Sequence, residues 1–543
     1  MVQSSSSSSS SSLIARRRRV ARAFKSRGLT LHASALDGMM SVLSHERSDE
    51  IDIVLQTIID ACKEKNVRIV TQDLLTSVVS DLTKNDKDVI DESMQLLNAF
   101  DTPRLHYEPL RKQFTLLSCE SKSLFGDVTD KVDMFAQRFE LVRQRILKQD
   151  VFRPKLVTAD GRQASSDPRH VTHTLTTIES LLGRSGARFL LGMLVQGEQE
   201  GQYCLEDHTA QVPLKMSDAQ LLTEGIITKY CIVLVEGEMT EDGVLQVHRM
   251  GNPIIERRTE SIQGIGLQSA DLFRSISGLN ELEAVRNQEA LHGPEGMMVV
   301  LSNVHLDNTH VMEKLRTMFL GFAGSGNPFF VLMGNFLSFP CPNGRELIGY
   351  MDELATILEE TGVAQNGRFL FVPGPRDAGL SSDVLPRPPL PKYICRNFRK
   401  RVPGATFGTN PCRLRYFTKE LVLYRNNVTS ELQLESLLHT NNDTSTPSQN
   451  AIKTILDQGH LCPYQRAVYW AYDHALRLYP LPDAILLGET TQQYYETYVG
   501  CDVVNPGSCA SSPDFPFVVY RPVVSVEEDG STRSDVEFSQ ILD

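Results

Sequence analysis

Several patterns that mark particular protein classes are missing from this chain of 543 residues. No apolar run approaches the length of about 18 residues that a membrane-spanning helix needs. Ten cysteines are present, but no two stand in a C-x-x-C pair, which argues against a zinc ribbon, a redox pair or a disulfide scaffold. The serine-rich start has no apolar stretch that could serve as a secretory signal. These absences favour a protein with reduced thiols in the cytosol or nucleus.

The overall charge is also informative, because it disfavours two classes of partner. The formal net charge is −12, so the molecule as a whole repels nucleic acid and anionic membranes, and we expect no membrane partner and DNA binding that is weak at most. One segment departs from this, since it carries seven positive charges and no negative one: Arg16, Arg17, Arg18, Arg19, Arg22, Lys25 and Arg27. It could be a nuclear-import or DNA-phosphate patch, or the solvated face of a first helix. The two interpretations are compatible.

The first third of the chain predicts a disordered start, a small helical domain and a connector. Residues 1–14 are serine-rich and cannot bury a core. Residues 15–100 predict a helical domain, because apolar residues recur at helical spacing within 51–62, 74–82 and 90–97. Residues 101–165 are mixed, with turn signals at both ends and one expected helix around Met134 to Ile146. We interpret this segment as a connector.

Residues 166–262 predict a small β-barrel. Apolar residues alternate with a period of two in five short runs: 189–195, 203–206, 212–216, 230–236 and 244–249. Five such strands in so short a segment are typical of an OB-fold, a barrel that often binds single-stranded nucleic acid. Acidic residues crowd the segment and aromatic residues are few, so we expect a packing or partner role and not DNA binding. A linker is expected at 263–292.

Residues 293–543 predict an α/β domain. Apolar strands are expected at 298–301, 329–333 and 369–372, with amphipathic helices around 311–322 and 347–358 between them. Strands of this kind, joined by amphipathic helices, are buried on both faces of a sheet. Functional residues of such domains are found in the loops that follow the strands. The fold class is therefore multidomain α+β, with helical, barrel and α/β parts.

The loops after these strands resemble those of the calcineurin-like metallophosphoesterases. That family carries D-x-H, G-D-x-x-D/N, G-N-H-D/E and G-H-x-H segments after successive strands. The corresponding segments here read Asn303-Val304-His305, Gly334-Asn335-Phe336-Leu337-Ser338, Gly374-Pro375-Arg376-Asp377 and Gly488-Glu489-Thr490-Thr491. The resemblance implies an α/β sandwich of the phosphoesterase type.

The departures from those motifs affect the metal ligands. Asn303, Asn335 and Ser338 replace acidic or amide ligands, Pro375 and Arg376 replace an asparagine and a histidine, and Glu489 and Thr491 replace two histidines. Of the set, only His305 and Asp377 remain. Two divalent cations need bridging carboxylates, which neutral asparagines cannot supply, and Arg376 adds a positive charge. We therefore expect no metal, no cofactor and no catalysis, and a structural role for His305. An active phosphoesterase with unusual ligands is the alternative.

A helical domain, an OB-fold and a ligand-poor phosphoesterase domain on one chain resemble the B subunits of replicative DNA polymerases. The epsilon type is favoured by specific segments, which include Ala99–Arg104, Thr176–Gly183, Phe371–Asp377, Leu385–Leu390, Thr409–Arg413 and Val468–Asp473. The similarity runs from about residue 20 to 520 and leaves out the serine-rich start, the insert at 427–450 and the acidic end at 527–543. B subunits of the delta or alpha type are the near alternatives.

The resemblance implies a nuclear, non-catalytic scaffold in chromosomal DNA replication. Such a subunit is expected to bind the C-terminal region of the polymerase catalytic subunit through its barrel and phosphoesterase-like domains. Its N-terminal helical domain is expected to bind the GINS part of the replicative helicase. A free-standing DNA-binding protein that uses the OB-fold and the basic segment at 16–27 is a further alternative.

Overall fold

The computed structural model describes most of the chain beyond residue 93. Described there are residues 94–541 except 118–122, 153–172, 182, 200, 218, 267–269, 277, 325–327, 342, 380–382, 440–444, 465 and 527–531. Before them, it describes residues 17, 20, 22–32, 35, 36, 39, 58, 59 and 69–72. The chain divides into two compact units, 1–92 and 93–543. Within the described ranges, no helix has the length and apolar character needed to cross a membrane.

The described part of the first unit contains a helical segment and one pair of strands. Val20 and Phe24 are buried, whereas Arg22 and Lys25 on the same segment are exposed. Strands β1 (Thr30–Leu31) and β2 (Ile69–Val70) pair in parallel. Most of the stripes predicted as helices at 51–62 and 74–82, and the start of the third at 90, lie outside the described residues.

The end of the third predicted helix is wrong. Met94–Asn98 forms strand β3, which pairs antiparallel with β18 (Cys412–Tyr416) and places Leu97 opposite Arg413. Five residues with apolar side chains at 94, 96 and 97 fit either period, so the pattern alone is ambiguous. A strand more than 300 residues away along the chain supplies the hydrogen-bond partners, and this tertiary pairing overrides local helix preference.

The predicted connector contains a β-hairpin and a long helix. Strands β4 (Arg104–Glu108) and β5 (Gln113–Leu117) pair antiparallel, and helix α6 spans Val128–Lys148. The helix begins at Asp127, whose carboxylate accepts from two backbone amides, as an N-cap residue does. Its buried residues, which include Leu141 and Ile146, contribute to cores shared with the hairpin and with the barrel.

The barrel is present where the alternating pattern predicts it. Its strands are β6 (Leu175–Thr176), β7 (Arg188–Gln196), β8 (Tyr203–Glu206), β9 (Gln211–Lys215), β10 (Gln220–Leu221), β12 (Ile232–Met239) and β13 (Leu245–Gly251). The order β10-β13-β12-β7-β8-β9 closes through a pairing between β13 and β9. Leu190, Val233 and Val247 are among the side chains that fill its interior. The five predicted strands are confirmed, each shifted by at most three residues at either end.

The linker predicted at 263–292 is largely helical. Helix α7 (Arg258–Ile265) ends in it, and helix α9 (Leu279–His292) leads into the α/β domain. A 3-10 turn at Gly293–Glu295 follows α9 directly.

The α/β domain is a sandwich of two six-stranded sheets. One has the order β17-β16-β15-β14-β24-β25 and the other β22-β23-β21-β19-β18-β3. The first comprises β14 (Met298–Leu301), β15 (Phe329–Met333), β16 (Arg368–Val372), β17 (Ala405–Phe407), β24 (Phe517–Val526) and β25 (Thr532–Ser539). The second adds to β3 and β18 the strands β19 (Lys419–Arg425), β21 (Ala484–Gly488), β22 (Tyr494–Tyr498) and β23 (Cys501–Asn505). Part of the acidic end at 527–543 is thus the edge strand β25.

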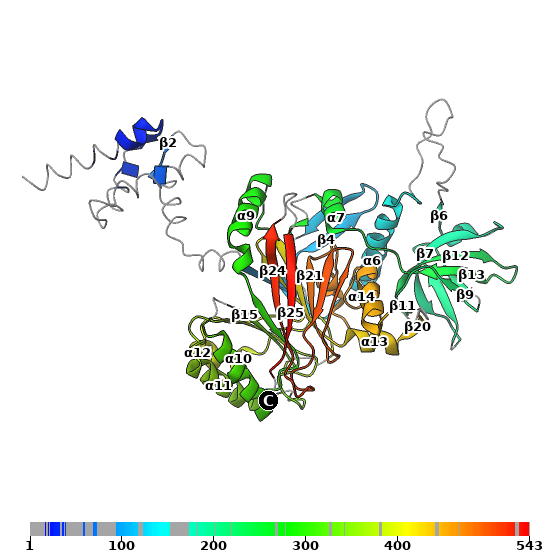
Figure 1. The fold of residues 1–543 in the computed structure, drawn as a ribbon. Helices are drawn as coiled ribbons and strands as arrows, with labels where there is room; N and C mark the ends of the chain where they lie inside the picture. Colours follow the sequence, from blue (N-terminus) through cyan, green and yellow to red (C-terminus); the bar gives the residue numbers. More distant parts are fainter. Residues whose placement is uncertain are drawn as a thin grey trace, which may run out of the picture. The chain divides into compact units, whose positions relative to one another are not determined.

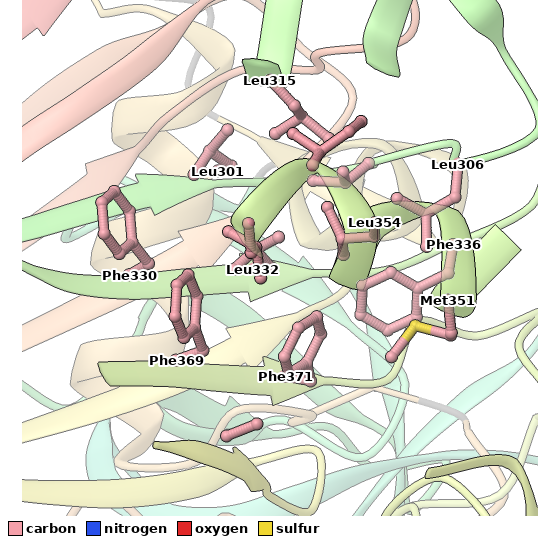
Figure 2. Packing of buried hydrophobic residues seen from close by; sticks show 14 of the residues in the cluster. Leu301, Leu306, Leu315, Phe330, Leu332, Phe336, Met351, Leu354, Phe369 and Phe371 are labelled. Atoms are coloured by element: carbon pink, nitrogen blue, oxygen red, sulfur yellow. The ribbon is translucent and has the colours of Figure 1, made fainter. Parts of the chain in front are cut away.

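Helices cover the outer face of the first sheet. Helices α10 (Thr309–Phe322), α11 (Arg345–Glu360) and α12 (Lys392–Arg401) lie together beside the first sheet (Figure 1). Figure 2 shows Phe330 and Phe369 on neighbouring strands of that sheet, within the same core as Leu315 and Leu354 of α10 and α11. The structure confirms the strands and helices predicted here. Long apolar runs and clear helical stripes are the most reliable local signals, which explains why the prediction succeeded.

The barrel is joined to the sandwich by paired strands and by buried hydrogen bonds. Strand β11 (Ile226–Thr228) pairs with β20 (Ser436–His439), and helices α13 (Val428–Leu434) and α14 (Pro447–Gln458) lie next to them. The side chain of Gln458 at the end of α14 bonds both the N–H and the C=O of Ile232 on barrel strand β12. The insert at 427–450 therefore supplies part of the contact with the barrel.

Candidate functional site

Loops from both sheets meet where parallel strands end. In the first sheet β14, β15 and β16 run in parallel, and in the second β19, β21 and β23 do. The amide of Asn303 donates to the hydroxyl of Ser508 at 2.8 Å, which links the loop after β14 to the loop after β23. The backbone N–H of Arg376 donates to Asn335 Oδ1 at 2.9 Å, which links the loops after β16 and β15. These loops are the ones that carry the sequence-predicted residues.

A buried arginine that the sequence analysis did not single out lies among these loops. Arg425, the last residue of β19, is only 1% exposed. Its guanidinium donates to the carbonyl oxygens of Gly334 and Gly488 (3.0 Å to Gly488) and to Oδ1 of Asn303 at 3.3 Å. Burial lowers the pKa of Arg425 to about 10, so it remains charged at neutral pH. The cation at this meeting point of loops is thus a side chain of the protein itself.

Asp377 holds two loops together with both carboxylate oxygens. Oδ1 accepts from the N–H of Phe336 and Oδ2 from the N–H of Gly374, each at 2.7 Å. Burial raises the pKa of Asp377, while these amides and the nearby Arg387 and Arg425 act in the opposite direction. The loops approach so closely that a Cβ atom on Gly334 would lie 1.8 Å from Asp377 Oδ2. Glycine is therefore required at 334, and Asp377 has no oxygen left without a partner.

Glu489 is also engaged, by groups of helix α13, of strand β22 and of its own loop. Its carboxylate accepts from the N–H and hydroxyl of Thr429 at 2.7 and 2.9 Å, from Tyr494 Oη at 3.0 Å and from the hydroxyl of Thr491 at 3.2 Å. The residue is completely buried, and burial raises its pKa. Glu489 therefore bonds both to Thr491 and to the start of α13.

The remaining predicted residues lie at the rim of the meeting point. The hydroxyl and N–H of Ser338 both donate to Asp307, the latter at 2.9 Å. Arg376 is exposed, and Pro375 is half-buried and accepts from Arg387 through its carbonyl. His305 is half-buried, and burial together with Arg376 and Arg425 lowers its pKa. Its Nε2 atom has no hydrogen-bond partner among the described residues.

The chemistry of this arrangement is that of a cross-linked junction. Among the residues that the structure describes, no group of three or more His, Cys, Asp or Glu side chains could hold a metal ion. Both oxygens of each buried carboxylate, Asp377 and Glu489, accept from protein donors, and Arg425 adds a positive charge that acts on both. Such a set binds the loops to one another.

The basic segment predicted at the start of the chain belongs to the other unit. Arg17, Arg22, Lys25 and Arg27 are exposed. Arg16, Arg18 and Arg19 lie outside the described residues. The burial of Val20 and Phe24 agrees with a helix that has one apolar face and a basic solvated one.

The sequence does not predict the place of Arg425 in the site, and the reason can be identified. The phosphoesterase motifs contain acids, amides and histidines, and an arginine matches none of them. The available signal is its position directly after the apolar run Leu421-Val422-Leu423-Tyr424, where a charged residue ends a buried strand. Charged residues are almost never fully buried unless they are paired, so such a strand end indicates a polar junction.

Comparisons with known proteins agree along nearly the whole chain. Residues 128–254 match the family model "DNA polymerase epsilon subunit 2-like, OB-fold domain", and residues 298–497 match the family model of the DNA polymerase alpha/epsilon B subunit. The chain is 34% identical to human DNA polymerase epsilon subunit 2 over 537 residues, which covers 95% of this chain and 98% of that protein. The DNA polymerase epsilon B subunit of Arabidopsis thaliana is 31% identical, with 93% and 96% covered, and that of Saccharomyces cerevisiae is 26% identical, with 79% and 74% covered.

Solved structures resemble the chain only distantly. An archaeal phosphodiesterase aligns with 44% of this chain and 99% of its own, at 12% identity and a TM-score of 0.24. The sequence relatives carry the assignment instead. On the strength of identity above 30% along almost the full length of both proteins, the chain belongs to the family of DNA polymerase epsilon B subunits, also called subunit 2.

Proposed function

We propose that this chain is a non-catalytic scaffold subunit of a DNA polymerase epsilon complex. The observation that carries the non-catalytic part is the position of the Arg425 guanidinium, among the loops that hold metal ions in the phosphoesterases that the sequence resembles. Family membership supports the role as a polymerase subunit.

Electrostatics supports the loss of metal-dependent chemistry. A two-metal centre needs several carboxylates to balance the charge of two divalent ions. Here a fixed guanidinium lies at the meeting point, and Asn303 and Asn335 contribute no charge. Asp377 and Glu489 are each engaged by at least two protein donors, so a metal would have to break those bonds. A protein built in this way keeps the sandwich as a rigid surface.

The partners that we propose follow from the family. The barrel and sandwich together bind the C-terminal region of the polymerase epsilon catalytic subunit, and the N-terminal domain binds the GINS part of the replicative helicase. A permanent subunit contact would bury about 2,000 Å² or more. The complex works in the nucleus, and DNA contacts of this subunit are weak because its net charge is −12.

The direct test is co-expression with the C-terminal half of the polymerase epsilon catalytic subunit of the same organism, followed by size-exclusion chromatography. We expect a stoichiometric complex that survives the column. The corresponding halves of the delta and alpha catalytic subunits serve as controls and should elute separately. If the folded chain does not co-elute with the epsilon catalytic subunit but does co-elute with the delta or alpha subunit, the assignment moves to that sibling complex.

The enzyme alternative has its own test. The purified chain should contain less than one tenth of an equivalent of manganese, iron or zinc, and should not hydrolyse a generic phosphodiester above background. Stoichiometric metal together with hydrolysis that disappears on chelation would contradict the scaffold proposal. The DNA-binding alternative predicts affinity that falls steeply with salt and depends on residues 16–27. No measurable binding at moderate salt would exclude it.

A further inference from the structure

A small cavity lies where helix α6 meets the segment that follows helix α14. Its volume is about 20 Å³, enough for one species of about the size of a water molecule. Its lining comes from α6, from the end of α14 and from the chain around His460 and Arg477: Arg138, Leu141, Val142, Arg145, Gln458, Gly459, His460, Arg477 and Tyr479. Because α6 packs against the barrel and the other residues belong to the sandwich domain, the cavity lies at the junction of two domains.

Hydrogen-bond donors without partners surround this cavity. Arg145 is 3% exposed, and its Nη2 donates to the carbonyl oxygen of Asp457 at 2.6 Å. Its Nε and Nη1 have no partner among the described residues, and neither has Nη1 of Arg477, which is 5% exposed. Buried donors of charged groups rarely remain unpaired, since each costs about 1–3 kcal/mol or more. Three N–H-bearing atoms of two guanidinium groups thus lack an acceptor here.

The charges around the cavity do not balance. Three guanidinium groups line it, those of Arg138, Arg145 and Arg477. The carboxylate of Asp473 already accepts from Arg138, Arg477 and His460. Burial and the neighbouring arginines hold His460 in its neutral form, with a pKa lowered to about 4.

Asp457 and Glu256 act electrostatically on Arg145, but the hydrogen bonds of their carboxylates go to other groups. Asp457 directs its Oδ1 to the N–H of Ile255 at 3.2 Å and to Tyr498 Oη at 3.1 Å. Glu256 pairs with Lys148 at 3.3 Å and also accepts from Tyr479. The cavity therefore keeps a positive excess that no lining carboxylate removes, in a place where uncompensated charge is costly.

We propose that this cavity binds one small monovalent anion of the halide class, with chloride as the physiological form. The free N–H groups of Arg145 and Arg477 are its donors. A water molecule would fill the space but would leave the positive charge uncompensated. With room for about one water-sized species, the cavity favours a monatomic ion over the larger sulfate and phosphate. The bound ion joins α6 to the sandwich and so stabilises the contact between the two domains.

The first test compares anions at constant ionic strength on the purified full-length chain. Replacing sodium gluconate by sodium chloride at the same concentration should raise the midpoint of thermal unfolding by about 1–3 °C, as linkage predicts for a ligand well above its Kd. Sodium sulfate stabilises proteins in general, so its effect on the unfolding midpoint is first measured on a control variant and subtracted. After this correction, sulfate should not raise the midpoint as chloride does. Arg145→Met should abolish the difference between chloride and gluconate.

The matched control is Arg249→Met. Arg249 pairs with Glu236 on the barrel surface and has a 48% exposed side chain, so this variant should keep the full response to chloride. An equal chloride response in both variants would overturn the proposal. If Arg145→Met does not fold, crystals of the unmodified chain grown in sodium bromide decide the matter. An anomalous bromine peak in the cavity supports the proposal, and water density without such a peak refutes it.

Discussion

Replacing Arg425 by methionine tests whether its guanidinium holds the loop junction together. Methionine keeps most of the side-chain volume and removes the charge and every donor. The lost contacts are those to the carbonyls of Gly334 and Gly488 and to Oδ1 of Asn303 and Asn427. Hydrogen bonds to charged groups contribute about 1.5–3 kcal/mol each. Four such bonds set an upper limit to the loss of stability, and two effects reduce it.

The two reductions can be read from the structure. The carbonyl of Gly334 also accepts from the N–H of Asn303, and that of Gly488 from the N–H of Asn426, so neither is left bare in the variant. The variant also no longer buries a cation, a cost that is visible in the lowered pKa of Arg425. We therefore expect the free energy of unfolding to fall by about 2–4 kcal/mol.

The assay is urea unfolding followed by circular dichroism and by fluorescence. Arg316→Met is the matched control, because Arg316 pairs with Glu360 on the surface of the same domain and both side chains are about half exposed. Exposed pairs contribute about 0–1 kcal/mol, so the control should unfold nearly as the parent does. If Arg425→Met loses less than about 1 kcal/mol, the guanidinium does not hold the junction and the argument built on it fails.

Three further predictions concern pH, the domain contact and the N-terminal unit. Burial lowers the pKa of His460 and of His474 to about 4 and raises that of Asp457 to about 7. Between pH 6.5 and 5 the two histidines of the unfolded chain go from about half protonated to almost fully protonated, whereas the folded chain holds about one proton, on the carboxyl of Asp457. The unfolded chain therefore binds up to about one proton more than the folded chain as the pH falls, and acidification over this range destabilises the fold by roughly 1–2 kcal/mol. Urea midpoints that do not change over this range would contradict these pKa values. Gln458→Ala should cost about 2–4 kcal/mol by removing both hydrogen bonds to the backbone of a barrel strand, and should increase proteolysis of the barrel; unchanged proteolysis would argue against the bridge. Deleting residues 1–92 should leave the thermal midpoint of the remaining chain and its binding to the catalytic subunit intact, and the deletion must end before β3 begins at residue 94. Helicase binding, measured by a pull-down with GINS, should be abolished. A folded fragment that no longer binds the polymerase would contradict this division.

At residues 94–98, just after the end of that deletion, the secondary structure predicted from the sequence differs from the one in the structure. Residues 94–98 read as the end of a helical stripe, yet they form the edge strand β3 of the second sheet. Apolar spacing over five residues cannot separate the two periods, and the deciding partner, β18, is remote in sequence. By contrast, runs such as Phe329–Met333 and stripes such as that of α11 are long enough to fix their structure locally.

The candidate site divides in the same way. The order of the loops and the loss of ligand types at Asn303, Asn335 and Glu489 are properties of the sequence, because they depend on residue identity after recognisable strands. The position of Arg425 cannot be predicted from the sequence, because the residues around it do not indicate which loops of the other sheet it contacts.

The sequence by itself was thus sufficient to predict the barrel, the strands of the sandwich, the replacement of most metal ligands and the family of this chain. Only the tertiary structure decided which cation lies between the loops, which acids are saturated, and that three arginines from two domains surround one small cavity. The physical reason is that periodicity and residue type act over a few neighbouring residues. Burial of charge, in contrast, depends on groups that are brought together across hundreds of residues, and its cost or gain exists only once they are packed.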